Sequence, residues 1–140
     1  LPHAPIAFGA NCGTGASDLL RTVLGVTEAA PDAVVIAKAN AGIPKYVDGK
    51  IEYDGTPELM ARYACMARDA GARLIGGCCG TKPEHLVAMR AALEQHPKGS
   101  RPTLELIEAD IGPFTSASDG TGEEATEAPR ARGRRGRRRG

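Results

Sequence analysis

Three of the four cysteines in this 140-residue chain stand where a parallel α/β fold would bring them together. Cys12 comes shortly after one apolar stretch, and the adjacent Cys78 and Cys79 come directly after another. Glycines flank both places and permit the close backbone approach that a tight cluster requires. Three thiolates around one point are typical of a zinc ligand set. With only three protein ligands, the fourth tetrahedral position is left for a substrate, as in catalytic zinc sites.

Two plainer interpretations of these cysteines stay open on spacing alone. Free cysteine packs as a small hydrophobic side chain, so Cys78 and Cys79 could be core residues. They could also form a disulfide, although a bond between adjacent cysteines is strained and a reducing compartment would break it. Cys65 is expected on the polar side of a helix, far from the strand ends, and is assigned no role. The histidines (His3, His85 and His96) are expected to be surface residues rather than ligands.

Alternating strands and helices must position the cysteines. Apolar runs predict strands over 5–9, 33–39 and 73–77. The β-branched run within 33–39 predicts burial on both faces, as in a parallel sheet. Two architectures fit this order: a doubly wound open sheet and a piece of a (β/α)8 barrel. Both place their sites just after the carboxyl ends of the strands, where the cysteines lie.

Apolar residues at helical spacing predict helices after each strand. Thr56 is the expected N-cap of one helix, and Thr81 and Glu84 have the spacing of a capping box for another. The irregular stretch 40–55 is expected to be a loop with a small hairpin around Asp48-Gly49. The expected helices are 16–26, 57–70, the segment behind Thr81 that carries Leu86 and Leu93, and 103–109.

Charge and composition exclude several classes of protein. The chain carries 18 Lys and Arg against 17 Asp and Glu, but seven of the arginines lie in the last eleven residues, so the rest of the chain is mildly acidic. Hydrophobic residues make up 41% of the sequence, which is enough for a core. No run approaches the roughly 20 apolar residues of a membrane span, and no segment has the pattern of a signal peptide. A membrane protein, a collagen and a wholly disordered chain are therefore excluded.

The two ends of the chain carry their own expectations. The sequence begins at Leu1 rather than Met, which suggests the back part of a longer protein. From about Gly112 onward Ser, Thr, Gly, Glu and then Arg dominate, and disorder is expected. The Arg-rich tail could contact nucleic-acid phosphates without sequence specificity. It has no interleaved aromatics for base stacking, which argues against nucleic acid as a partner.

Three motifs resemble the homocysteine S-methyltransferase family. They are Gly-Ala-Asn-Cys at 9–12, Asn-Ala-Gly-Ile-Pro at 40–44 and Gly-Gly-Cys-Cys-Gly-Thr-Lys-Pro-Glu-His at 76–85. The family includes betaine–homocysteine methyltransferases and the homocysteine-binding module of cobalamin-dependent methionine synthases. The resemblance covers roughly residues 5–110 and implies the last three βα units of a (β/α)8 barrel. It divides the chain into a barrel part at 1–111 and a disordered linker and tail at 112–140.

The resemblance also implies a site and a reaction. It makes Cys12, Cys78 and Cys79 the Zn²⁺ ligands, with homocysteine as the methyl acceptor. Betaine or a similar donor with a good leaving group would supply the methyl group. Asn11 and Asn40 could bind substrate or merely shape turns. Tyr46 and Tyr53 could line a donor site, but we favour loop packing for both.

Two further expectations complete this interpretation. The enzyme is expected in the cytoplasm, with a homo-oligomer left open, no membrane contact and poor activity of this chain alone. The alternative is a catalytically inactive zinc-binding barrel fragment with a basic tail.

Overall fold

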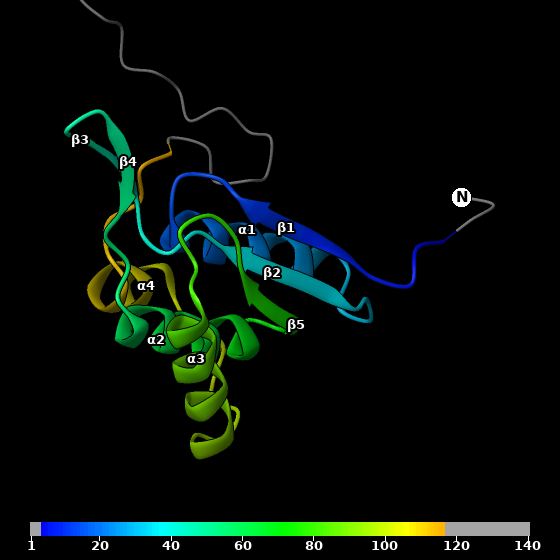
Figure 1. Ribbon diagram of the computed structural model, residues 1–140. Helices are drawn as coiled ribbons and strands as arrows, with labels where there is room; N and C mark the ends of the chain where they lie inside the picture. Colours follow the sequence, from blue (N-terminus) through cyan, green and yellow to red (C-terminus); the bar gives the residue numbers. More distant parts are fainter. Residues whose placement is uncertain (1–3, 117–140) are drawn as a thin grey trace, which may run out of the picture.

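The computed structural model describes residues 4–116, which form a mixed α/β fold (Figure 1). All three predicted strands and all four predicted helices are present, but the first strand lies three residues later than the predicted 5–9 and ends at Cys12. In chain order the elements are β1 (Phe8–Cys12), α1 (Ala16–Ala29), β2 (Val35–Ala39), β3 (Pro44–Val47), β4 (Lys50–Tyr53), α2 (Pro57–Asp69), β5 (Ala72–Gly77), α3 (Pro83–Gln95) and α4 (Leu104–Asp110). Within this described part, no helix is long and apolar enough to cross a membrane.

The central sheet is parallel and has the strand order β1-β2-β5. Its register places Cys12 beside Ala39, and Ala39 beside Gly77. These are the last residues of the three strands, so the strands end level with one another. The segments that follow them therefore share one edge of the sheet, as the strand–helix alternation predicts.

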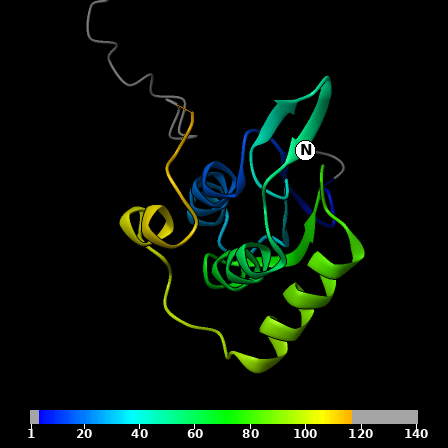
Figure 2. The ribbon, with the colours of Figure 1, turned by 60° about the vertical axis from the view of Figure 1, so that its left-hand side comes forward.

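Helices α1 and α2 pack on the same face of this sheet (Figure 2). Val35 and Ala37 of β2 point toward them and are buried, whereas Lys38 between Ala37 and Ala39 is exposed. The prediction that 33–39 is buried on both faces is therefore wrong. Side chains alternate along a strand, and the described helices enclose only one of its faces. On the other face Leu74 of β5 is 51% exposed.

The core lies between this face and the two helices. Leu20 and Val23 of α1 and Met60 of α2 are fully enclosed, and burying side chains of this size contributes about 1.5–3 kcal/mol each. The Tyr63 hydroxyl accepts a hydrogen bond from the backbone N–H of Ala39 at 3.1 Å. Burial raises the pKa of the Tyr63 phenol, so it stays neutral. This bond anchors the carboxyl end of β2 on helix α2.

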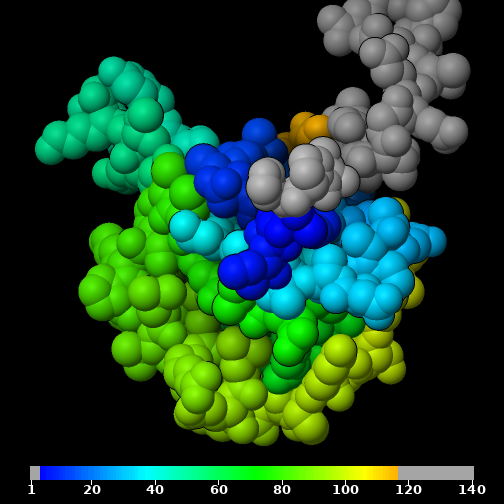
Figure 3. Space-filling view, turned by 90° about the vertical axis from the view of Figure 1, so that its right-hand side faces the viewer, coloured from blue at the N-terminus to red at the C-terminus, as the bar shows by residue number. Residues whose placement is uncertain are grey.

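Strands β3 and β4 form an antiparallel hairpin that stands out from the body of the molecule (Figure 3). Asp48 and Gly49 at its tip have φ values of 48° and 79°. A type I′ turn needs positive φ at both central residues, so the hairpin expected there is confirmed. Tyr46, near the tip, is 77% exposed.

Local signals at the helix starts are borne out for α2 but not for α3. The Thr56 hydroxyl accepts a hydrogen bond from the Leu59 N–H at 3.2 Å, as an N-cap should. At α3 the cap is Lys82, and its backbone N–H donates to Nδ1 of His85 at 3.0 Å. The capping box predicted at Thr81 and Glu84 is therefore wrong, because the helix begins one residue later than that pattern requires.

Residues 111–116 follow α4 and lie against the first turn of α1. The Ser17 hydroxyl donates to the Gly112 carbonyl at 2.7 Å. The backbone N–H groups of Thr115 and Ser116 each donate to the Asp18 carboxylate at 3.1 Å. This part of the predicted linker thus contacts the folded part. Residues 117–140, with the Arg-rich tail, and residues 1–3, with His3, lie outside the described residues.

Candidate metal centre

Three cysteine sulfurs converge at the carboxyl edge of the parallel sheet. The Sγ atoms of Cys12, Cys78 and Cys79 all lie within 4.8 Å of one another. The Cys12 and Cys79 sulfurs are 3.7 Å apart, and those of Cys78 and Cys79 are 4.0 Å apart. The parallel topology brings together residues separated by 67 positions in sequence, as the spacing predicts.

These distances fit a metal ion better than either alternative for the cysteines. Four ligands at about 2.3 Å from a tetrahedral zinc place two sulfurs about 3.8 Å apart. A disulfide would need about 2.05 Å, and all four cysteines are free. Cys79 is exposed and the other two are half-buried, so none of the three packs as a core residue. Three thiolates this close repel one another unless a cation lies between them, which makes the donor set suitable for Zn²⁺.

The backbone conformation of Cys12 and the backbone hydrogen bonds of Cys78 and Cys79 hold the three thiols in this arrangement. Cys12 has a φ of 66°, which costs a non-glycine residue about 1–3 kcal/mol and turns its side chain at the end of β1. On the other side of the cluster, the N–H of Cys78 donates to the Ala39 carbonyl at 2.7 Å, and the N–H of Ala41 donates to the Cys79 carbonyl at 2.9 Å. The two vicinal cysteines are therefore fastened to the end of β2 and the loop after it.

Asn40 joins the two halves of the cluster. Its side chain is only 2% exposed. Nδ2 donates to the Gly13 carbonyl at 2.8 Å, and Oδ1 accepts from the Cys79 N–H at 3.1 Å. Of the two roles left open for Asn40, these contacts fit the shaping of the site.

Asn11 reaches the cluster by a weaker contact. Its Nδ2 lies 3.9 Å from the Cys78 sulfur, on the exposed side of the sheet. Partial burial raises the pKa of Cys78, but hydrogen bonds from Asn11, Cys12 and Cys79 outweigh it and bring the pKa of Cys78 below its usual value. The pKa of Cys79 is raised, chiefly by its hydrogen bond with Cys12. The pKa values of the two vicinal cysteines are thus shifted in opposite directions.

Tyr53 borders the cluster, which was not expected from the sequence. It ends β4 at the base of the hairpin, and its side chain lies beside the cluster. Partial burial and the neighbouring cysteines, Cys79 above all, raise the pKa of the phenol. Tyr46 lies near the tip of the same hairpin and is largely exposed. The Tyr53 ring packs against Gly80 in the loop after β5, which fits the expected loop packing, and the same packing brings it to the cluster. The signal that could have found it is the position of Tyr53 just before Asp54-Gly55, where the hairpin must return to the strand ends.

His85 is the clearest correction among the histidines. It is 5% exposed, not a surface residue. Nδ1 accepts from the Lys82 N–H at 3.0 Å, so Nε2 carries the proton and donates to the Gly55 carbonyl at 2.8 Å. His85 thus links the start of α3 to the base of the hairpin. It is not a member of the three-cysteine group.

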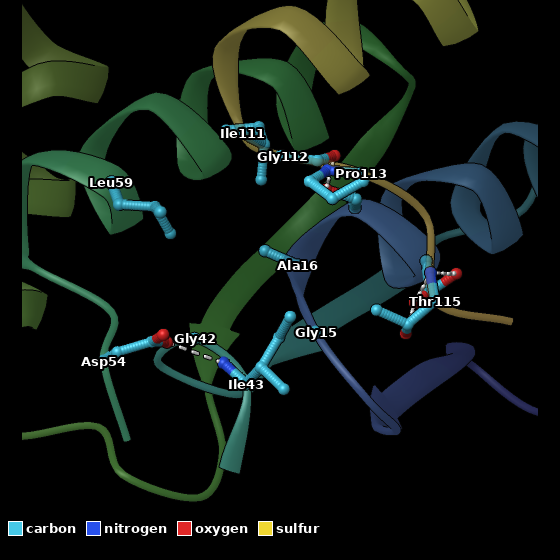
Figure 4. A pocket seen from close by; sticks show the side chains of 12 residues that line it. Gly15, Ala16, Gly42, Ile43, Asp54, Leu59, Ile111, Gly112, Pro113 and Thr115 are labelled. Carbon is cyan, nitrogen blue, oxygen red and sulfur yellow. Dashed lines mark hydrogen bonds between the residues drawn. The ribbon is translucent and has the colours of Figure 1, made fainter. Parts of the chain in front are cut away.

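Cys65 does not belong to the cluster, and two cavities of the described part have none of the three clustered cysteines in their lining. Cys65 lies within α2 and lines a cavity shared with Leu106 of α4, away from the strand ends. A second cavity, of about 180 Å³, lies at the start of α1 (Figure 4). The Asp54 carboxylate at its rim already accepts from the Ile43 N–H at 2.9 Å and pairs with Lys45 at 2.7 Å.

The fold and the cysteine cluster together indicate the class of protein, and a comparison with known families identifies the family. A parallel α/β sheet with an accessible three-thiol cluster at its strand ends is typical of proteins that present a metal to a substrate. The family model of homocysteine S-methyltransferases matches residues 1–93 of this chain. The chain therefore belongs to the homocysteine S-methyltransferase family, a family of methyltransferases, and the resemblance noted in its motifs is confirmed.

Proposed function

We propose that this chain is the zinc-bearing part of an enzyme that transfers a methyl group to the thiol of homocysteine and forms methionine. The observation that carries this proposal is the convergence of the Cys12, Cys78 and Cys79 sulfurs within 4.8 Å. Membership of the homocysteine S-methyltransferase family supports the acceptor and the type of reaction. The proposed Zn²⁺ ligands are these three cysteines.

The chemistry requires an activated thiol. A free thiol has a pKa of about 8.5, so it is mostly protonated at neutral pH, and only the thiolate is a good nucleophile. Zinc, when bound, would keep a coordinated thiol deprotonated and available for attack on a methyl group. The three cysteines would supply the metal ligands. Asn40 connects them, because its side chain bonds Gly13, next to Cys12, and the backbone of Cys79.

The methyl donor must carry a leaving group. As the methyl carbon bonds to the homocysteine sulfur, its old bond breaks and the leaving group takes that electron pair. The thiol proton goes to solvent. Quaternary ammonium compounds such as betaine, sulfonium compounds, and methylated corrinoids or folates all meet this requirement. Betaine is our first candidate.

The sheet is proposed to be the last three βα units of a (β/α)8 barrel, with residues 1–111 as the barrel part. Three features support this architecture. The strands are parallel, the described helices α1 and α2 cover one face, and the cysteines lie at the carboxyl ends, where barrels place their sites. The exposed face with Lys38 and Leu74 would then be the barrel interior. A cytoplasmic location is proposed because four free thiols persist in a reducing compartment.

Metal content tests this proposal. We expect one zinc per chain in the purified protein and in a Cys65→Ser control. We expect almost none in the Cys78→Ser/Cys79→Ser double variant. Calorimetric titration of the zinc-loaded chain should then show homocysteine binding more tightly than methionine, which has no free thiol. Zinc retained by the double variant, or equal binding of the two amino acids, would overturn the proposal. Methionine formation with each donor class identifies the donor.

A further inference from the structure

Hydrogen bonds at the base of the β3–β4 hairpin fix the position of Tyr53. Tyr53 pairs with Pro44 across the hairpin. Next to it, the Asp54 carboxylate accepts from the Ile43 N–H at 2.9 Å. The N–H of Gly55 donates to the Ala41 carbonyl at 2.8 Å. These bonds tie the end of β4 to the loop that follows β2, beside the cysteine cluster.

Close packing against the vicinal-cysteine turn fixes the Tyr53 ring. A Cβ on Gly80 would lie 2.3 Å from Cγ of Tyr53, so the ring rests directly on the glycine backbone. Gly80 also has a φ of 75°, a conformation that glycine adopts without strain. Gly80 directly follows Cys79, so the ring held there lies beside the Cys79 side chain, and the nearness of the two groups contributes to the raised pKa of the phenol.

Of the Tyr53 hydroxyl and the Cys79 sulfur, only one can donate a hydrogen bond when a metal is bound. A cysteine sulfur that holds a metal has lost its proton and offers only lone pairs. The phenol carries an O–H donor. We propose that Tyr53 is a positioning residue of the metal centre, which donates a hydrogen bond from its hydroxyl to the Cys79 sulfur and so sets both the orientation of that ligand and the charge it gives to the metal. This inference rests on the proposed zinc site.

The proposal has a spectroscopic consequence. A hydrogen bond to a thiolate withdraws electron density from sulfur and lowers the energy of its lone pair. More light energy is then needed to move an electron from sulfur to a bound metal. Loss of the hydroxyl should therefore shift a sulfur-to-metal charge-transfer band to longer wavelength. Because partners of metal ligands also orient them, the loss should weaken metal binding by about 10–100-fold.

The experiment compares Tyr53→Phe with Tyr46→Phe in the full chain. The first change removes the hydroxyl and keeps the ring over Gly80. The second removes a hydroxyl from the same hairpin at a site that is 77% exposed. Co²⁺ is titrated into each metal-free protein, the charge-transfer band is recorded, and Zn²⁺ affinity is measured by competition with a chromophoric chelator. We expect a longer-wavelength band and at least about 10-fold weaker Zn²⁺ binding in Tyr53→Phe alone.

Three results would overturn the inference, and they differ in what else they reject. Wild-type protein that binds neither metal rejects the zinc site and the inference together. Wild-type binding with an unchanged band and affinity in Tyr53→Phe rejects the inference alone. A loss of affinity in Tyr53→Ala that is absent in Tyr53→Phe would show that the ring packs against Gly80 and that the hydroxyl plays no part. Far-ultraviolet circular dichroism of the metal-free variants confirms that each is folded.

Discussion

The side chain of Asn40 accepts a hydrogen bond from the backbone N–H of Cys79 at 3.1 Å, and the same side chain donates to Gly13 at 2.8 Å. One buried amide thus spans the loop after β1 and the loop after β5. Cys12 ends β1 directly before the first of these loops, and Cys78 and Cys79 begin the second. The distance between Cys12 and the vicinal pair therefore depends on Asn40 as well as on the sheet.

Replacement of Asn40 by alanine should destabilise the protein by about 2 kcal/mol. The change removes two part-buried hydrogen bonds, to the Cys79 N–H and to the Gly13 carbonyl, and each such bond contributes about 0.5–1.5 kcal/mol. Urea unfolding of the metal-free protein measures this loss, and chelator competition should show weaker zinc binding. Asn11→Ala is the control, since Asn11 is exposed and makes only the 3.9 Å contact. Its stability should change by less than about 0.5 kcal/mol. Equal losses in both variants would contradict the bridging role.

The meeting of the cysteines could be predicted because it depends on topology. Parallel strands that end level place Cys12 and Cys78 at one edge, whatever the details of packing. The type I′ turn at Asp48 and Gly49 was equally predictable, because positive φ at both positions favours few residue types.

The rest of the site depends on contacts between distant segments, which have no local signature. His85 has the sequence context of an exposed first helical turn, yet the returning hairpin supplies the Gly55 carbonyl and buries it. Tyr53 is brought to Cys79 by the same return of the chain. The β-branched run in β2 predicts burial, but the number of layers around the sheet decides whether one face or both are covered.

Alanine at Gly9 should disrupt the pairing of β1 with β2. A Cβ there would lie 1.9 Å from the backbone oxygen of Ile36, and backbone atoms of a central strand cannot move aside cheaply. The expected loss is about 1–3 kcal/mol, the usual cost of overpacking, with weaker zinc binding because Cys12 lies on the displaced strand. Gly25→Ala in α1 is the matched control. No atom lies within 4 Å of its added methyl group, and the helix should gain about 0.5–1 kcal/mol. Wild-type stability in the Gly9 variant would contradict the close strand contact.

Zinc should stabilise the folded chain, by an amount that grows with the logarithm of the free zinc concentration divided by its dissociation constant. Metal that binds only the folded state adds about 2.7 kcal/mol at a free concentration 100 times the dissociation constant. Thermal unfolding followed by circular dichroism should therefore show a midpoint several degrees higher with zinc than with a chelator. Cys12→Ser removes one of the three sulfurs and should abolish most of this shift, whereas Cys65→Ser should keep it. A shift of the same size in Cys12→Ser would place the metal elsewhere.

The carboxylate of Asp18 should make stability depend on pH in the acidic range. Partial burial raises the pKa of Asp18, but hydrogen bonds from Thr115, Thr14 and Ser116 outweigh it and hold the pKa below the ordinary value of 3.8. The unfolded chain therefore binds the proton more readily than the folded one. The stabilisation is fully present above the unfolded pKa and is lost as pH falls through the folded pKa.

Asp18→Asn tests this dependence, because the amide keeps the shape of the side chain but does not titrate. The free energy of unfolding of wild type should exceed that of Asp18→Asn by a constant amount between about pH 5 and 7. The difference should shrink below about pH 4. Thr115→Val removes one donor to the carboxylate and raises the folded-state pKa, so its acid loss of stability should be smaller than in wild type and complete at a higher pH. If the difference in free energy of unfolding between wild type and Asp18→Asn stayed constant down to about pH 2, the carboxylate would not be the group that holds residues 112–116 against α1.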